Sequence, residues 1–282
     1  MSDLGKFEHP TIDGFWGFCI ERETIRLRKE MGVPYPWTED LILQMYFFCN
    51  VKREYDKGTQ WYLKNVAFPE IRGKLNADLL WKSILYRSIN SIEYFETVLD
   101  GQLFGPEEWA EHKKTIWRCI EAGTLPSNSA YIVLQGPDGA DRKTHLKEQL
   151  DYLEKDIEHL THIVKDAPTL KDVWKALQYV PYVGPFIALQ VYRDLILVDA
   201  IPFNDNEFTY LGPGARSGLE LFGFERYKAQ YLALQEIQKA HPPDLELNLG
   251  DVEQSMCEYR KWINLKAGGG RRRYYKGHMA ND

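Results

Sequence analysis

Apolar residues recur every three or four positions through most of the chain, and this spacing limits the fold more than any other feature. It is clearest between residues 141 and 166, where the apolar positions are Leu146, Leu150, Leu153, Ile157 and Leu160. Side chains three and four residues apart share one face of an α-helix, so this segment is predicted to be an amphipathic helix. The same spacing predicts helices over about 13–31, from Thr38 to about Val66 with a break near Asn50, and from Leu79 to Phe104.

The remaining segments give few signs of β-structure. Only residues 130–134 are predicted to form a short extended piece, which a loop at 135–140 follows. Pro106 stands where a proline suits the first turn of another helix. With 282 residues, of which 44% are hydrophobic, the chain can bury the core of one large domain or of two packed lobes. We therefore expect an all-α fold, with a helical domain over 1–267 and a flexible basic tail over 268–282.

The turn Val180–Pro185, between two predicted helices, has the residues of an anion-binding corner. Thr169 is suited to cap the first helix, and Pro185 suits the first turn of the second. Free amide groups at the start of a helix attract anions, and a glycine lets a phosphate come close. Val183 and Gly184 are therefore candidate DNA-binding residues. A plain helical corner explains the same residues, and the turn alone does not separate the two interpretations.

This turn resembles the helix–hairpin–helix of DNA glycosylases, which holds one DNA strand by its backbone. That motif usually carries a glycine on each side of an apolar residue, whereas Tyr182 takes the first of these positions here. In such glycosylases a carboxylate follows the turn, and this chain offers Asp205 and Glu207, for which solvated loop acids are the alternative. Gly212 and Gly214 come next and form a second candidate anion cradle before another helix.

Several stretches, taken in order, match one family across most of the chain. They span about Phe15 to Tyr275 and are Phe15-Trp16 with Glu21-Arg22-Glu23, Pro36–Asp40, Phe48–Asp56, the turn, Leu211–Ala215, Val252-Glu253, Cys257–Tyr259 and Gly268–Arg273. Through them the chain resembles the amino acid:DNA transferases of bacteriophage thymine hypermodification, earlier named α-glutamyl/putrescinyl thymine pyrophosphorylases. The helical domain of 5-hydroxymethyluracil DNA kinases is related to this family.

The resemblance implies a glycosylase-like helical fold that acts on a modified thymine in double-stranded DNA. The family's reaction replaces the pyrophosphate of 5-pyrophosphoryloxymethyl-uracil with the amine of an amino acid or a polyamine. It also implies a functional link to a DNA kinase that acts earlier on the same base. The chain contains no Gly-Lys-Ser/Thr phosphate loop, so we expect no kinase fused to it.

This chemistry assigns a role to each candidate residue. The carboxylate that accepts the amine proton could be Asp56, Asp205 or Glu207. A departing pyrophosphate needs cations, for which Lys52 and Arg53 are candidates. A flipped base needs an aromatic wall, for which the candidates are Trp16, Trp37 and Phe48. A bound substrate needs polar anchors, for which the candidates are Asn50, Arg22 and Arg26. Core packing of the rings and ion pairing of the cations remain the alternative interpretations.

Charge and residue counts argue against several other classes. A net charge of −6 disfavours a protein that coats nucleic acid but is compatible with a local basic patch. The concentrated basic run is Arg271, Arg272 and Arg273, which either binds DNA phosphates or is a solvated tail. The four cysteines lie far apart and the seven histidines form no ligand pattern, so we expect neither a metal nor another cofactor. No apolar run is long enough to span a membrane, and we expect a cytoplasmic protein, in the host cytoplasm if phage-encoded.

Two other functions fit the same residues. The chain could be a non-catalytic DNA-binding partner of a 5-hydroxymethyluracil DNA kinase, or a glycosylase that excises a base. The partner would bind DNA without turnover, whereas the glycosylase would leave abasic sites in modified DNA.

Overall fold

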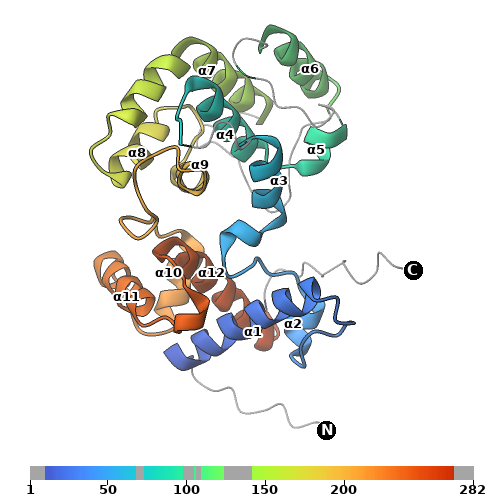
Figure 1. Ribbon diagram of the computed structural model, residues 1–282, viewed down its shortest axis with the longest axis vertical. Helices are drawn as coiled ribbons and strands as arrows, with labels where there is room; N and C mark the ends of the chain where they lie inside the picture. The colour runs from blue at the N-terminus through green and yellow to red at the C-terminus, as the bar shows by residue number, and fades with distance from the viewer. Residues whose placement is uncertain (1–9, 68–72, 98–104, 106–108, 124–141, 270–282) are drawn as a thin grey trace. The chain divides into compact units, whose positions relative to one another are not determined.

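In the computed structural model of the chain, the regular structure is helical, which confirms the predicted all-α class (Figure 1). The structure describes residues 10–67, 73–97, 105, 109–123 and 142–269, and no β-strand occurs among them. The twelve α-helices of these residues are α1 (Ile12–Glu30), α2 (Leu41–Met45), α3 (Lys57–Asn65), α4 (Ala77–Ile89), α5 (Ile92–Thr97), α6 (Trp109–Glu121), α7 (Arg142–Lys165), α8 (Leu170–Leu177), α9 (Pro185–Leu197), α10 (Pro213–Glu220), α11 (Tyr227–Lys239) and α12 (Leu249–Lys266). The 3₁₀ helices η1 (Arg53–Tyr55) and η4 (Pro243–Leu245) are also described.

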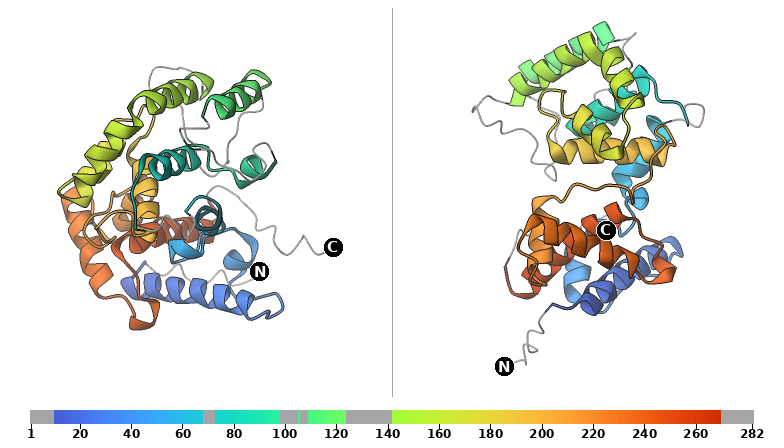
Figure 2. Two further views of the ribbon diagram at one scale, coloured as in Figure 1. Left: turned by 45° about the horizontal axis from the view of Figure 1, so that its top comes forward. Right: turned by 90° about the vertical axis from the view of Figure 1, so that its left-hand side faces the viewer.

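The chain divides into two compact units. Unit 1 combines residues 1–56 with residues 211–282, and unit 2 consists of residues 57–210. Helices α1, α2 and α10–α12 therefore belong to unit 1, and α3–α9 belong to unit 2. In Figure 2 the blue helices from the start of the chain lie together with the orange and red helices from its end. Unit 1 is thus a core built from both ends of the chain, and unit 2 is inserted in sequence between them.

Two glycines bring α10 into close contact with α12 in unit 1. Gly214 and Gly218 lie four residues apart, on one face of α10. A Cβ at Gly214 would lie 2.2 Å from Cys257 Sγ, and a Cβ at Gly218 would lie 2.6 Å from the carbonyl oxygen of Met256. The absence of both side chains therefore sets the distance between the two helices. Because α12 also carries the polar residues of the site described below, this packing positions that site.

Aromatic side chains fill the space between α1 and α12. The Phe15 ring meets Tyr259 edge-on at 5.5 Å, and Phe18 meets the same ring at 5.6 Å. Phe15, Phe18 and Tyr259 are buried. Such edge-to-face contacts add to the free energy gained by burying the rings. The predicted helix over 13–31 is confirmed as α1, which begins after a Thr11 side-chain cap on the amide of Gly14.

Buried ion pairs join the elements of unit 2. Arg87 of α4 makes two hydrogen bonds to Asp194 of α9, with nitrogen–oxygen distances of 2.5 and 2.7 Å. Next to it on α9, Arg193 Nε lies 2.6 Å from Asp205 Oδ2, so the loop after α9 is tied to that helix. All four side chains are buried. Removing one partner of such a pair leaves a buried charge uncompensated, so these pairs are costly to break singly.

The structure corrects two predicted helix boundaries. The helix predicted from Thr38 begins only after Asp40, whose carboxylate caps the amides of residues 42 and 43, and it ends at Met45. Residues 46–52 are then non-helical and α3 follows at Lys57, so the interruption is much longer than a break near Asn50. The helix predicted from Leu79 to Phe104 is interrupted at Asn90, which caps α4 in the left-handed conformation with φ 48°.

Other predictions for helices and strands are confirmed or fall outside the described residues. The helix predicted over 141–166 is α7, and the Thr169 side chain accepts a hydrogen bond from the amide of Asp172 at the start of α8. Pro185 occupies the first turn of α9, as predicted. Pro106, the extended piece over 130–134 and the loop over 135–140 lie outside the described residues.

The glycine packing of α10 makes a stability prediction. Gly218→Ala should destabilise the protein by about 1–3 kcal/mol, because its Cβ would meet backbone of α12 that has little room to shift. Gly17→Ala, in the exposed middle of α1, is the matched control, because a Cβ there meets nothing within 4 Å. Alanine favours a helix over glycine, so the control should be neutral or stabilising by up to about 1 kcal/mol. Urea unfolding measures both changes, and equal unfolding free energies for the two variants would contradict the packing argument.

Candidate functional site

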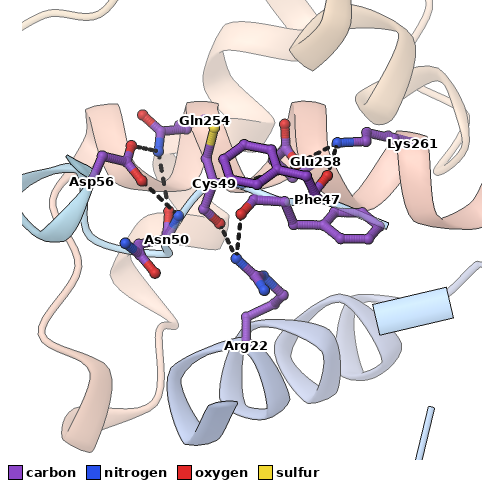
Figure 3. Close-up of polar contacts among 9 residues, drawn as sticks. Arg22, Phe47, Cys49, Asn50, Asp56, Gln254, Glu258 and Lys261 are labelled. Carbon is purple, nitrogen blue, oxygen red and sulfur yellow. Dashed lines mark hydrogen bonds and ion pairs between the residues drawn. The ribbon is translucent and has the colours of Figure 1, made fainter. Parts of the chain in front are cut away.

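The candidate site of unit 1 forms where residues 46–56, a mostly irregular segment, run along one face of α12. Four polar residues of α12 contact this segment, and their spacing of three, four and three residues places them on one helix face: Asp251, Gln254, Glu258 and Lys261. Figure 3 shows three of them beside the segment. An irregular segment has no ladder of backbone hydrogen bonds, so its polar groups need side-chain partners when they are removed from water.

Each polar residue on this face of α12 binds a different part of the segment. Lys261 Nζ donates to the carbonyl oxygen of Phe47, and the amide of Cys49 donates to Glu258 Oε2 at 3.4 Å. Gln254 Nε2 donates to the carbonyl oxygen of Asn50 at 3.1 Å. The amide of Arg53 donates to Asp251 Oδ1 at 3.2 Å. The helix face therefore fixes the path of the backbone from residue 47 to residue 53.

Arg22 holds the same segment from α1. Its Nη2 donates to the carbonyl oxygens of Phe48 and Cys49 at 2.7 and 2.5 Å (Figure 3). The guanidinium is buried, and burial lowers the pKa of Arg22, with nearby acids led by Glu258 opposing this effect. The sequence suggested Arg22 as a substrate anchor. Its buried position instead gives it a structural role, because it orients the segment that carries the other candidates.

Asp56 ends the segment in a network of neutral donors. Its Oδ1 accepts from the amide of Asn50 at 2.8 Å, and its Oδ2 accepts from Gln254 Nε2 at 3.2 Å (Figure 3). Asn50 also donates through its own side chain to the carbonyl oxygen of Tyr55 at 2.7 Å. Burial raises the pKa of Asp56 to about 6, against the opposing effects of the Asn50 amide and of the Arg53 charge. The carboxyl group therefore exchanges its proton near neutral pH.

The other cationic candidates of unit 1 have partners within the protein. Arg26 forms ion pairs with two glutamates of its own helix, Glu23 and Glu30, and its guanidinium carbon lies 4.0 Å from the centre of the Tyr55 ring. Lys52 Nζ lies 3.7 Å from the exposed carboxylate of Glu246. Arg53 is buried. Of these three, Lys52 has a partner that is highly exposed, and the attraction of an exposed ion pair is weak.

The three aromatic candidates differ in accessibility. Trp16 and Phe48 are buried in the core of unit 1, whereas Trp37 is half-buried. The Tyr35 ring meets Trp37 edge-on at 5.2 Å, and Lys29 Nζ lies 4.6 Å from the centre of the Trp37 ring. Trp37 is therefore the least buried of the three candidates.

The carboxylates predicted in the loop after α9 belong to unit 2 and lie in other surroundings. Asp205 is buried against Arg193, as described above. Glu207 is exposed, and its Oε1 accepts from the backbone amide and the side-chain amide of Asn204 at 2.9 and 3.1 Å. Glu207 thus closes its own loop, and Asp205 fixes that loop to α9. Neither shares a unit with Asp56.

The predicted DNA-binding turn of unit 2 has an unusual backbone. Tyr182 is left-handed with φ 62°, whereas Gly184 has φ −76° and ψ 176°, which any residue adopts. A Cβ at Gly184 would meet nothing within 4 Å, while Val183 is buried. Neither local conformation nor packing within the described residues requires glycine at 184.

Gly212 and Gly214 have roles within unit 1. The amide of Gly212 donates to Glu253 Oε1 at 3.0 Å, so a carboxylate of the protein occupies the start of α10. Gly214 makes the contact with Cys257 described above. These contacts within the protein are enough to explain why glycine stands at both positions, without a role in DNA binding. Arg271, Arg272 and Arg273 lie outside the described residues.

The polar face of α12 was not predicted from the sequence. Gln254, Glu258 and Lys261 were not assigned a role, although their spacing of four and three residues on a helix was visible. What the sequence does not show is the partner of that face, because the contacts join residues about 200 positions apart, as for Gln254 and Asn50. A polar stripe on a helix otherwise indicates a solvated face.

Two further features of the described residues bear on chemistry. The four cysteines are free, and no group of three or more His, Cys, Asp or Glu side chains in the described part of the chain is placed to hold a metal ion. None of the described helices is both long enough and apolar enough to cross a membrane.

Comparisons with known proteins relate the chain to 5-hmdU DNA kinases in two ways. A family described as "5-hmdU DNA kinase, helical domain" matches residues 9–269. A protein named 5-hmdU DNA kinase from Bacillus phage SP10 is 25% identical over 282 residues, covering 88% of this chain and 44% of that protein. The chain therefore spans less than half the length of this relative. No solved structure matches the chain.

The raised pKa of Asp56 predicts how stability depends on pH. A carboxyl group that ionises less readily in the folded than in the unfolded protein stabilises the fold while it is protonated. This contribution is lost as pH rises from the ordinary carboxyl pKa of 3.8 to about 6. Asp56→Asn removes the titration and keeps an oxygen for the Asn50 amide. Urea unfolding between pH 4 and pH 7 should show that the variant loses less unfolding free energy than the wild type over this range. Equal losses would contradict the raised pKa.

Proposed function

Because the chain belongs to the family of 5-hmdU DNA kinase helical domains, we propose that it modifies thymine-derived bases in DNA as a transferase. The substrate is a 5-pyrophosphoryloxymethyl-uracil base in double-stranded DNA, and the donor is the amine of an amino acid or a polyamine. A bond forms between the amine nitrogen and the methylene carbon, while the bond from that carbon to the pyrophosphate oxygen breaks. The amine loses one proton, and pyrophosphate departs.

Asp56 is the observation that carries this proposal. The amine must lose its proton to form the product, so the site needs a base that works near neutral pH. The pKa of Asp56, about 6, suits that role, and its oxygens are held by amide donors. Among the described residues it forms no ion pair, so no cation of the protein competes with the proton that it accepts from the attacking amine. Asp205 is a poorer candidate, because Arg193 already pairs with it in the core.

The residues around Asp56 support the remaining parts of the reaction. Lys52 has an exposed ion-pair partner, Glu246, and serves as the cation for the departing pyrophosphate. Trp37, the half-buried ring, provides the stacking wall for a flipped base. Arg22 and Asn50 act indirectly, since they hold the segment that carries Lys52 and Asp56.

The turn of unit 2 supports binding to the DNA backbone. Gly184 stands at the start of α9, where amide groups have no helical partner, and open space lies around its α-carbon. A phosphate oxygen can approach such an amide closely only where no side chain intervenes. Binding of a phosphate would therefore account for the glycine at 184, which the fold itself does not require. The basic run at 271–273 remains a proposed second contact with the backbone.

The direct test is mass spectrometry of nucleosides. Purified protein is incubated with DNA that contains 5-pyrophosphoryloxymethyl-uracil and with a panel of amino acids and polyamines. We expect a nucleoside whose mass equals that of the pyrophosphorylated substrate nucleoside plus one amine minus one pyrophosphoric acid, together with released pyrophosphate. DNA binding without any change of base mass would instead indicate an accessory partner of a DNA kinase, and abasic sites would indicate a glycosylase.

Asp56→Asn tests the proposed base. Adduct formation should fall about 100-fold or more, because general base catalysis typically contributes about that factor, while DNA binding should be unchanged. The wild-type rate, divided by the fraction of the donor amine that is neutral, should rise with pH to a plateau above about 6, the pKa of Asp56. Glu207→Gln is the matched control, since the amide keeps an oxygen for Asn204. Retained activity in Asp56→Asn, or equal losses in both variants, would rule out Asp56 as the base.

Gly184→Val tests the turn. The backbone of Gly184 accepts any residue and a Cβ there meets open space, so the variant should fold, with a loss of about 1 kcal/mol because valine is a poorer N-cap than glycine. Affinity for DNA of any sequence should nevertheless fall about tenfold, because the side chain keeps a phosphate away from the amide. Fluorescence anisotropy with a labelled duplex measures binding, and thermal unfolding checks the fold. Wild-type affinity in the folded variant would remove the turn from the DNA-binding surface.

A further inference from the structure

An apolar stripe runs along the exposed face of α1. Ile20, Leu27 and Met31 are 47%, 45% and 78% exposed, and Thr24, between them, is partly exposed. The spacing of Ile20, Thr24, Leu27 and Met31 is four, three and four residues, which is the spacing of the a and d positions of a coiled coil. Single exposed apolar residues are common, but a stripe of them along one helix indicates a binding surface.

This stripe is not part of the core of unit 1. The opposite face of α1 carries the buried residues Phe15, Cys19, Arg22 and Ile25, and it packs toward α12. Figures 1 and 2 show α1 along an edge of unit 1. Among the described residues, twelve large apolar side chains are exposed, and eight of them fall between Ile20 and Phe47. The apolar exposure is therefore concentrated on α1 and the residues that follow it, including α2.

The charges beside the stripe are complementary to those of the same helix running in the opposite direction. Glu21 and Arg28 lie seven residues apart on the same flank, directly after Ile20 and Leu27. In an antiparallel pair of identical helices, equal flanks face each other, so Glu21 of one copy meets Arg28 of the other, twice by symmetry. Arg28 already donates to the carbonyl oxygen of Trp37, and its guanidinium has further N–H groups for a second acceptor.

The apolar layers match in the same arrangement. When Thr24 of one helix packs beside Leu27 of the other, Ile20 packs beside Met31, and the symmetry repeats both layers. On the other flank Glu23 and Glu30 of the two copies approach each other. Arg26 forms ion pairs with both of these glutamates on its own helix, which reduces their repulsion. Every exposed apolar residue of the stripe therefore gains a partner.

We propose that a second copy of this chain covers the stripe, so that two copies associate through an antiparallel contact between their α1 helices. The contact is isologous, because the same surface is used by both copies. It does not depend on the proposed transferase activity or on any residue of the site beside α12. The exposed residues of α2, Leu41 and Met45, are available to extend the contact beyond the two helices.

Sedimentation equilibrium of the full chain tests the association. Between about 1 and 200 µM, the mass of the wild type should rise from 33.0 kDa toward twice that value. Leu27→Glu should weaken the association at least about tenfold by placing a charge in the seam. Leu232→Glu, at a 53% exposed position of α11, is the matched control and should associate like the wild type. A wild type that stays monomeric at about 200 µM, or a dissociation constant unchanged by Leu27→Glu, would overturn the proposal.

A charge exchange identifies the orientation. Glu21→Arg alone and Arg28→Glu alone each place like charges opposite one another in both halves of the contact, so each variant should associate at least about tenfold more weakly than the wild type. A mixture of the two variants restores both opposite-charge pairs, and it should form heterodimers of near wild-type affinity. Circular dichroism confirms that both variants fold. A mixture that associates no better than its components would overturn the antiparallel contact.

Discussion

The structure of unit 1 depends on hydrogen bonds between an irregular segment and the side chains of a helix. Residues 46–52 lie outside the helices, yet Phe48 and Val51 within the segment are buried in the core. A buried amide or carbonyl without a partner costs about 1–3 kcal/mol, which is more than one hydrogen bond gains. The polar face of α12 and Arg22 of α1 supply these partners. Replacing any of them therefore changes the path of the segment, and not only one contact.

The same arrangement accounts for the difference between two carboxylates. Asp56 is surrounded by amide donors, and removal from water raises its pKa. Asp205 is buried too, but Arg193 forms an ion pair with it. A carboxylate in a low-dielectric place without a paired cation is poised to exchange a proton, whereas one beside a guanidinium serves to hold structure. Both residues were equal candidates in the sequence, and their surroundings separate them.

Structure that depends on local periodicity was predicted correctly from the sequence. Structure that depends on contacts with distant residues was not. The period of three and four in α7 and the cap of α8 by Thr169 depend on neighbouring residues, and both were predicted. The long interruption after Met45 was not, because Tyr46, Phe47 and Val51 keep a helix-like apolar spacing. Their segment is held open by α12, about 200 residues later, and no local pattern encodes that contact. The burial that tunes Asp56 has the same distant origin.

The turn of unit 2 contains a strained tyrosine that the rest of its unit holds in place. Tyr182 stands where glycine is usual and takes the left-handed conformation, which costs a non-glycine residue about 1–2 kcal/mol. Its ring stacks on His145 with centroids 3.8 Å apart, its hydroxyl donates to Glu148, and Gln149 donates to the carbonyl oxygen of Pro181. Contacts from α7 thus offset the strain of the left-handed backbone at Tyr182. The tyrosine at 182 is therefore a structural residue of unit 2, and its backbone conformation depends on contacts with α7 that lie more than 30 positions earlier in the sequence.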